Sequence, residues 1–395
     1  MSDSPTILVV GPTPPPFHGV SVAMDAILKS ALRGRFRLCH LDLADRRGIE
    51  HVDKPDLYDL CLVLKQCSQL AVLYLHNPPD LVYMAVSQST LGFLRDSLFL
   101  LPALMTGRKI VLHLHGGNFR VWYEARGKVM RCVVRKVLAR VSRVIVLGET
   151  FRSLFSGLVV PECIVVVPNG VKHPPVVPSV EPAKERFRIV YLGTLTRLKG
   201  LFVLMHAIPP VREKHMDVEF VFAGPWFDMR DQQAATAFIE AHHLGAHVIF
   251  TGPVTTAEQK HAILASAHVF VFPGVQQEGQ PLTVLEAMSE GLPVIATDRG
   301  CLQETIVEGE TGFLIPPGSS QAIADCIVRL IEDKEIRTRM AALAIARYRA
   351  HYTMERFIER MEAVLEDVVG KGRSSTVSLH NSQSDPSPKE LTSSR

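Results

Sequence analysis

The chain has 395 residues, of which 47% are apolar, 7% aromatic and 21% charged. This globular composition allows about two domains, each with its own core, and it excludes collagens, coiled coils and fully disordered chains. The seven cysteines are an odd number and contain no Cys-x-x-Cys pair, which argues against a disulfide scaffold, structural zinc and thioredoxin chemistry. We therefore expect reduced, apolar thiols in a cytoplasmic protein.

The formal net charge is only +3, but it is unevenly distributed. Residues 1–180 hold 21 Lys and Arg against 13 Asp and Glu, whereas residues 181–395 hold 22 against 27. A basic half suits an anionic partner, such as a phosphorylated ligand or an anionic membrane. Nucleic acid is disfavoured as the partner because aromatic residues are not interleaved with the basic ones.

The first half of the chain alternates apolar strands with helical patterns, which is typical of a parallel sheet covered on both faces. The predicted strands are 6–10, 36–41, 71–75, 109–113, 144–146 and 164–167. A Gly- and Pro-rich loop, 11–19, separates the first strand from a predicted helix, 21–32. A segment with five prolines, 168–182, then reads as a stiff linker.

A second alternating series follows the linker. Strands are predicted at 188–193, 218–223, 248–251, 268–272 and 293–297, and helices at 200–208, 282–290, 320–332 and 354–369. The predicted fold class is α/β, with two doubly wound, Rossmann-like domains, 1–180 and 181–350, facing across a cleft. We expect the helix within 351–369 to pack back towards the N-terminal domain, and the Ser-, Lys- and Pro-rich residues 370–395 to be disordered.

The N-terminus has neither the positive start nor the cleavage site of a signal peptide, and no apolar run reaches the ~18 residues of a spanning helix. The most basic segment, 126–143, places valines and a leucine on one helical face and cations on the others. Two interpretations stay open: a helix packed on a sheet with a solvated outer side, or a helix lying on a membrane surface.

The most informative motif holds two glutamates eight residues apart, in the segment 278–288. Glu278 is predicted to lie in the loop after a strand, and Glu286 within the following helix. Pro281 suits the first helical turn, where its missing N–H has no cost. The free N–H groups of Leu282 and Thr283 would then form an anion site aided by the helix dipole.

In this context the sequence resembles the retaining glycosyltransferases of the GT-B fold, family 4 (group 1 glycosyltransferases), which share this E-x7-E element. The resemblance continues in 291–300, in Glu304 and in 308–317, and it covers residues 185–350 well and the first half more loosely. It implies that Glu278 is a catalytic residue that holds the donor sugar and that Glu286 holds a ribose. The phosphates would lie between them, with Pro281, Leu282 and Thr283 also binding the donor. Gln280 stands inside the same element as a further donor-binding residue.

Two cations precede a predicted helix in the segment 193–200. Lys199 and Arg197 can place positive charge against a departing pyrophosphate, as the resemblance implies. Two solvated cations at a helix N-terminus are an unattractive alternative because they oppose the dipole. Relatives often have Arg where Thr194 stands, so the resemblance leaves open whether Arg197 supplies the second charge.

A histidine followed by two glycines ends another predicted strand, in 113–117. The resemblance places His115 beside the donor sugar as a catalytic residue, whereas a core histidine is the structural alternative. In the loop 14–20, Gly19 can bring backbone N–H groups to the donor phosphates. Asn169 and Gly170 match a hinge-side turn and are interpreted as structural.

The resemblance implies a retaining hexosyltransferase that moves a sugar from a nucleotide diphosphate sugar, with no cofactor and no metal. No Asp-x-Asp or His-Glu-x-x-His motif occurs in the chain. The implied acceptor is a saccharide or lipid-linked saccharide, bound mainly by the first domain. The basic, partly apolar first half then predicts a cytoplasmic enzyme of bacterial surface polysaccharide (exopolysaccharide) biosynthesis, in peripheral contact with the anionic inner membrane.

Two other activities use similar domains. A sugar-nucleotide 2-epimerase shares the fold and would need no acceptor, but the E-x7-E context argues against it. A nicotinamide-dependent oxidoreductase is less favoured because no G-x-G-x-x-G follows either opening strand.

Overall fold

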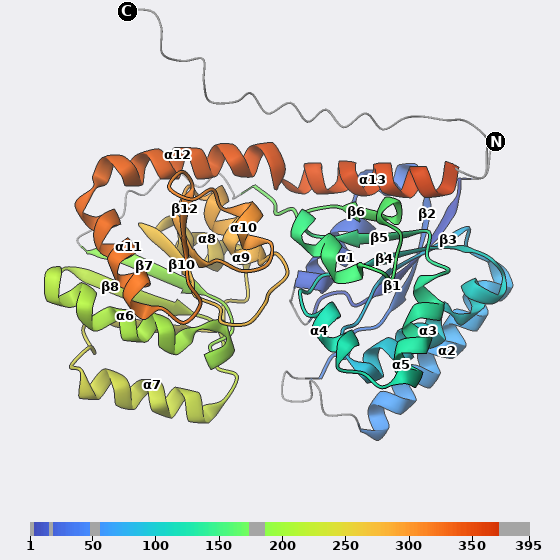
Figure 1. Ribbon diagram of the computed structural model, residues 1–395, viewed down its shortest axis with the longest axis horizontal. Coiled ribbons are helices and arrows are strands. Elements are labelled where there is room, and N and C mark those ends of the chain that lie inside the picture. Colours follow the sequence, from blue (N-terminus) through green and yellow to red (C-terminus); the bar gives the residue numbers. More distant parts are fainter. Residues whose placement is uncertain (1–3, 16–18, 48–55, 174–185, 371–395) are drawn as a thin grey trace, which may run out of the picture.

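The computed structural model describes residues 4–15, 19–47, 56–173 and 186–370. Two six-stranded sheets, each wholly parallel, lie side by side in two lobes (Figure 1). Helices cover both faces of each sheet, so the predicted fold class, α/β with two doubly wound domains, is confirmed. The boundary expected at residue 180 and the expected disordered residues 371–395 lie outside the described residues.

The first sheet has the strand order β2-β1-β3-β4-β5-β6. Its strands are β1 (Thr6–Gly11), β2 (Arg37–Asp42), β3 (Leu81–Ala85), β4 (Lys109–His113), β5 (Arg143–Val146) and β6 (Ile164–Val166). Its helices are α1 (Gly19–Lys29), α2 (Leu57–His76), α3 (Thr90–Met105), α4 (Phe119–Glu124) and α5 (Lys128–Leu138), with short 3-10 helices η1 (Ala31–Gly34), η3 (Glu149–Phe155) and η4 (Pro161–Cys163). Helices α2, α3 and α5 pack on one face of this sheet and α1 on the other.

The strand predicted at 71–75 is wrong, because these residues form the last turns of α2. A capping box between Asp56 and Asp59 starts this helix, and Pro78 and Pro79 follow its end. The strand itself, β3, begins only after the prolines and is almost wholly buried. The apolar run 71–75 thus follows helical spacing, with Leu73 and Tyr74 against the core and Leu75 exposed.

The second sheet has the order β12-β11-β10-β7-β8-β9. Its strands are β7 (Phe187–Leu192), β8 (Val218–Ala223), β9 (Val248–Gly252), β10 (Val269–Phe272), β11 (Val294–Thr297) and β12 (Gly312–Ile315). Its helices are η5 (Arg197–Lys199), α6 (Leu201–Lys214), α7 (Met229–Ala241), α8 (Ala257–Ala265), α9 (Leu282–Ser289), α10 (Leu302–Thr305), α11 (Ser320–Glu332) and α12 (Lys334–His351). The helix expected to end at 208 continues through Pro209 and Pro210 to Lys214.

The last helix, α13 (Met354–Gly370), follows α12 directly and lies over the first lobe (Figure 1). Its apolar face enters the core cluster that holds α1 and alternate residues of the first sheet. The buried residues on that face are Phe357, Met361, Val364, Leu365 and Val368. The chain returns from the second lobe to the first at Thr353, which bridges to Val171.

Candidate active site

The chain turns from β10 into α9 through the loop that holds the first motif glutamate. Pro281 is the N-cap of α9, and no side chain caps the helix. The N–H groups of Leu282 and Thr283 are therefore not taken by a capping side chain and point out of the first turn. Side chains cap α2, α3, α7, α8, α11 and α12, whereas α4, α5, α6 and α10 lack a side-chain cap, as α9 does. An uncapped helix N-terminus of this kind suits an anion.

The loop after β7 meets this turn. Lys199 Nζ lies 2.6 Å from Glu278 Oε1, and Gln276 Nε2 donates to the same oxygen at 2.8 Å. Gly200, in the left-handed conformation, makes this approach feasible because a Cβ there would lie 2.0 Å from the Pro273 carbonyl oxygen. Both partners are partly buried, with 29% of the Lys199 side chain and 18% of the Glu278 side chain exposed. A cation, a carboxylate and free amides are thus gathered around the start of α9.

Glu286, on the first turns of α9, has its own cation. Lys260 Nζ of α8 lies 2.6 Å from Glu286 Oε1. Glu286 Oε2 is buried and has no hydrogen-bond partner among the described residues. A buried carboxylate oxygen without a donor is costly, so it is suited to accept a hydrogen bond from a ligand hydroxyl.

Arg197 is directed elsewhere in the structure. Its Nε lies 2.7 Å from Asp231 Oδ1 of α7, and its guanidinium stacks over the Phe202 ring, 4.3 Å from the centroid. The structure thus brings Lys199 to the α9 turn and holds Arg197 beside α7. The role expected for Arg197 at the phosphates stays a prediction.

His115 lies just beyond the carboxyl end of β4, in the first lobe. Its ring lies against that of His113, with centroids 3.9 Å apart and ring planes tilted by 31°. His113 is fully buried, and its Nδ1 lies 2.7 Å from the Tyr83 hydroxyl on β3. Burial lowers the pKa of His113 well below its ordinary value, so the ring is neutral at pH 7 and its Nδ1 shares a hydrogen bond with the Tyr83 hydroxyl. The His113 ring is a rigid, uncharged support for the His115 ring.

The two lobes touch at the carboxyl ends of their strands. A Cβ on Gly279 would lie 2.0 Å from the His115 carbonyl oxygen, so the two loops are in backbone contact. Glu304 of α10 accepts hydrogen bonds from the N–H groups of Glu149 and Thr150, at 2.7 and 2.6 Å. Its carboxylate satisfies orphan donors at the start of η3. The lobe interface therefore places His115 beside the loop of Glu278.

Two of the expected donor-binding residues, Gln280 and Gly19, have surroundings that differ from those of Lys199 and Glu278. Gln280 is buried, and its side chain accepts from Asn169 N–H at 2.7 Å and donates to Thr305 Oγ1 at 3.0 Å. The role of Gln280 in binding the sugar donor stays a prediction. Its hydrogen bonds connect the hinge-side turn at Asn169 to α10. Gly19 is the first residue of α1, with open space around its Cβ position. The rest of its loop, 16–18, lies outside the described residues.

Sequence reasoning missed Lys260, Tyr83 and the bridging contacts of Glu304. Lys260 lies on α8, 26 residues before its partner Glu286, and no local pattern marks it. Tyr83 belongs to the strand that sequence reasoning placed ten residues too early. On neighbouring β4, Val111 pairs with Tyr83 and His113 pairs with Ala85, so Tyr83 lies diagonally from His113 on the same face of the sheet.

Two features are absent from the described residues. No group of three or more His, Cys, Asp or Glu side chains in that part of the chain is arranged to hold a metal ion. None of the helices described is both long enough and apolar enough to span a bilayer.

Comparisons with known proteins agree with this geometry. Residues 186–333 match the family model described as glycosyl transferases group 1. The phosphatidyl-myo-inositol mannosyltransferase of Mycobacterium leprae is 28% identical over 288 residues, which are 70% of this chain and 69% of that protein. The lipopolysaccharide 1,2-N-acetylglucosaminetransferase of Salmonella typhimurium is 24% identical over 56% of this chain and 62% of its own length.

The fold has solved counterparts as well. HepE from Anabaena, crystallised with UDP, superposes with a TM-score of 0.73 at 21% identity, over 92% of this chain and 100% of that one. At this identity the likeness shows the fold alone, which is GT-B. The GT-B fold expected from the resemblance is thus confirmed, and the match of residues 186–333 to group 1 glycosyl transferases agrees with the expected family.

Proposed function

We propose that this chain, a GT-B glycosyltransferase of the group 1, family 4 type, transfers a hexose from a nucleotide diphosphate sugar to a saccharide or lipid-linked saccharide, with retention of configuration. The single observation that carries the proposal is the 2.6 Å contact between Lys199 and Glu278 at the uncapped start of α9. This arrangement offers a diphosphate one mobile cation and two backbone donors. The carboxylates of Glu278 and Glu286 would accept hydrogen bonds from hydroxyl groups of the sugar and the ribose.

The proposed step breaks the bond between the anomeric carbon and the phosphate oxygen and forms a bond from the acceptor oxygen on the same face. The acceptor proton passes to the departing phosphate. Lys199 would turn from Glu278 to the diphosphate, adding charge where negative charge develops, and the Leu282 and Thr283 amides would bind the same group. Glu278 and His115 would hold the sugar, and Glu286 the ribose.

The setting is also a proposal. Two relatives are named for acceptors of the cell envelope, a phosphatidyl-inositol and a lipopolysaccharide. We extend this to a bacterial surface polysaccharide, made on the cytoplasmic face of the inner membrane. The excess of Lys and Arg over residues 1–180 supports contact of the first lobe with anionic lipid.

A panel of nucleotide sugars tests donor binding. The correct donor should raise the melting temperature because it binds the native state only. Lys199→Ala should lose that shift and lower turnover by roughly 10²–10³-fold. Lys214→Ala, at the exposed end of α6, removes the same charge as a control and should leave both unchanged.

Near-normal turnover of Lys199→Ala would refute the phosphate role. Product analysis completes the test. Donor incubated without acceptor should give no epimerised sugar nucleotide, whereas a 2-epimerase would convert it. Retention is read from the anomeric configuration of the linkage formed. Transfer in the presence of a chelator should match transfer without it.

A further inference from the structure

Helix α3 carries an apolar stripe on its outer side. The stripe repeats at spacings of three and four, which is one face of a helix. Its members are Leu91, Leu94, Leu98, Leu101 and Met105, with exposed fractions of 62%, 44%, 45%, 47% and 78%. The other face of α3 lies in the core. The only charged residues of the helix, Arg95 and Asp96, pair with each other at 2.8 Å.

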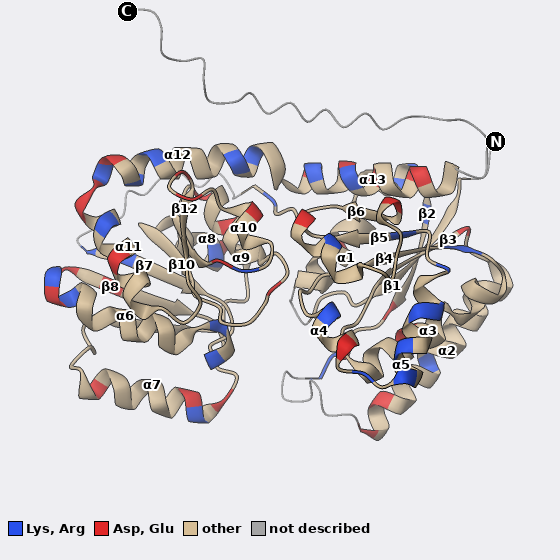
Figure 2. Ribbon diagram, in the orientation of Figure 1, with Lys and Arg blue, Asp and Glu red and all other residues tan. Residues whose placement is uncertain are grey.

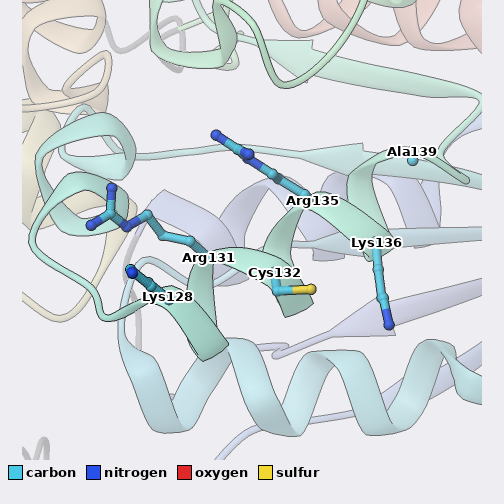
Figure 3. Close-up of a pocket in the computed structure, with 6 residues that line it drawn as sticks. All are labelled: Lys128, Arg131, Cys132, Arg135, Lys136 and Ala139. Carbon is cyan, nitrogen blue, oxygen red and sulfur yellow. The ribbon is translucent and has the colours of Figure 1, made fainter.

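Helix α5 carries cations on its outer side. Lys128, Arg131, Arg135 and Lys136 line a hollow of about 470 Å³ together with Cys132 and Ala139 (Figure 3). The opposite face, with Val134, Val137 and Leu138, is buried. No ion pair joins any of these four cations to a carboxylate within the described ranges, whereas Arg46, Arg47 and Arg120 of the same lobe are all paired. The helix therefore presents uncompensated positive charge.

The two faces belong to one surface. Helices α2, α3 and α5 cover the same face of the first sheet, and α3 and α5 connect consecutive neighbouring strands. The Arg126 guanidinium, just before α5, donates to Thr90 Oγ1 at the start of α3, at 3.1 Å. Basic residues gather on this part of the lobe in Figure 2, where α2, α3 and α5 lie together. Exposed Leu57, Leu60, Leu64 and Leu75 of α2 extend the apolar area.

We infer that this α3–α5 surface, defined by the α3 stripe and the four cations of α5, docks the first lobe onto an anionic lipid bilayer. The stripe would enter the boundary between headgroups and acyl chains, and the cations would contact lipid phosphates. An apolar stripe alone would suit any hydrophobic partner. The unpaired cations beside it select a negatively charged surface, and they disfavour a symmetric dimer, which would bring like charges together.

The inference deepens the proposed function, because it brings the lobe that would bind a lipid-linked acceptor to the bilayer. It rests on that function for its biological setting only. Vesicle binding and donor binding are separate measurements, so either can fail without the other.

The test is flotation of the full chain with vesicles of phosphatidylcholine alone or mixed with phosphatidylglycerol. Wild type should float with the anionic vesicles at low salt, bind neutral ones far more weakly, and dissociate at high salt. The triple variant Lys128→Gln, Arg131→Gln, Lys136→Gln should lower partitioning by roughly 100-fold. The triple variant Leu91→Gln, Leu98→Gln, Met105→Gln should lower it by roughly tenfold or more.

Matched controls lie on the second lobe. The triple Lys334→Gln, Arg339→Gln, Arg349→Gln removes the same charge from exposed positions of α12, and Met216→Gln, Met229→Gln, Leu343→Gln removes exposed apolar side chains. Both should partition like wild type. All four variants should keep the donor-induced thermal shift without vesicles, which shows that they are folded.

Three results would overturn the inference. One is the absence of wild-type binding to anionic vesicles. Another is equal loss in the α5 variant and its α12 control, which would indicate a general charge effect. The third is a concentration-dependent dimer that the α3 variant abolishes, which would assign the stripe to a second copy of the chain.

Discussion

Both motif glutamates are held by lysines from other elements, Glu278 by Lys199 and Glu286 by Lys260. Partly buried pairs of this kind fix the carboxylate oxygens in place, and removing one partner leaves an uncompensated charge. The Lys199–Glu278 pair connects the two loops that are proposed to bind the diphosphate. The second leaves one carboxylate oxygen of Glu286 available.

His113 supplies a pH-dependent prediction at the residue scale. Its pKa is depressed by burial in the folded chain and ordinary, about 6.5, in the unfolded chain. The unfolded state therefore binds the extra proton first as the pH falls. The stabilisation from the neutral ring is complete above about pH 6.5 and is lost progressively below it, towards the depressed folded pKa.

The measurement is urea unfolding of wild type and His113→Asn between about pH 7 and pH 5. Asn does not titrate, and its Oδ1 can still accept from the Tyr83 hydroxyl. Below about pH 6.5 the free energy of unfolding of wild type should fall more steeply than that of the variant, by up to about 1.4 kcal/mol per pH unit. Equal slopes would contradict a buried neutral His113.

At the scale of elements, the contact between the loops after β4 and β10 aligns the site. Gly279→Ala would place a methyl group against the His115 backbone, so the two loops would have to separate. We expect a loss of turnover on the order of 10²-fold, because His115 would move from the sugar position. Nucleotide affinity should change little, since the α9 amides and Lys199 stay together in the second lobe.

Steady-state kinetics and calorimetric titration with nucleoside diphosphate separate these two effects. Gly245→Ala is the control, because nothing lies within 4 Å of a Cβ built there. If Gly279→Ala left turnover unchanged, catalysis would take place with the two lobes further apart than they are in this structure.

A comparison of individual elements shows which features of the fold could be predicted from the sequence. Strands with continuous apolar runs and nearby Gly or Pro, such as β1, β4 and β8, were predicted within a residue or two. The run 71–75 failed because five apolar residues fit a strand as well as a helix end. The glutamate motif and Lys199 were identified from local motifs and from the family resemblance that these motifs carry. Lys260 was not identified, because only tertiary packing brings it to Glu286.

At the scale of the whole molecule, the C-terminal helix joins the two lobes. Lys109 Nζ contacts the Val368 carbonyl oxygen at the end of α13 at 2.6 Å, where a cation also complements the helix dipole. Arg143 pairs with Asp367 at 2.6 Å, and Arg35 with Glu362 at 2.8 Å. The last helix of the chain thus completes the core of the first lobe.

Phe357→Ala should therefore destabilise the first lobe by about 3–5 kcal/mol, because the ring is fully buried in that core. Trp122 reports on this lobe, so unfolding is followed by its fluorescence in a Trp226→Phe background. Glu359→Ala, on the exposed side of α13, should change stability by less than about 0.5 kcal/mol. Equal effects of the two substitutions would argue that α13 does not support the first lobe.

We propose that a diphosphate binds where the loop 193–200 meets the start of α9. The most direct measurement is a crystal structure of the complex with the nucleoside diphosphate that the thermal screen selects. We expect phosphate oxygens within hydrogen-bond distance of Lys199 Nζ and of the Leu282 and Thr283 amides, with the Lys199–Glu278 contact replaced. A diphosphate bound elsewhere, with that contact intact, would contradict the account.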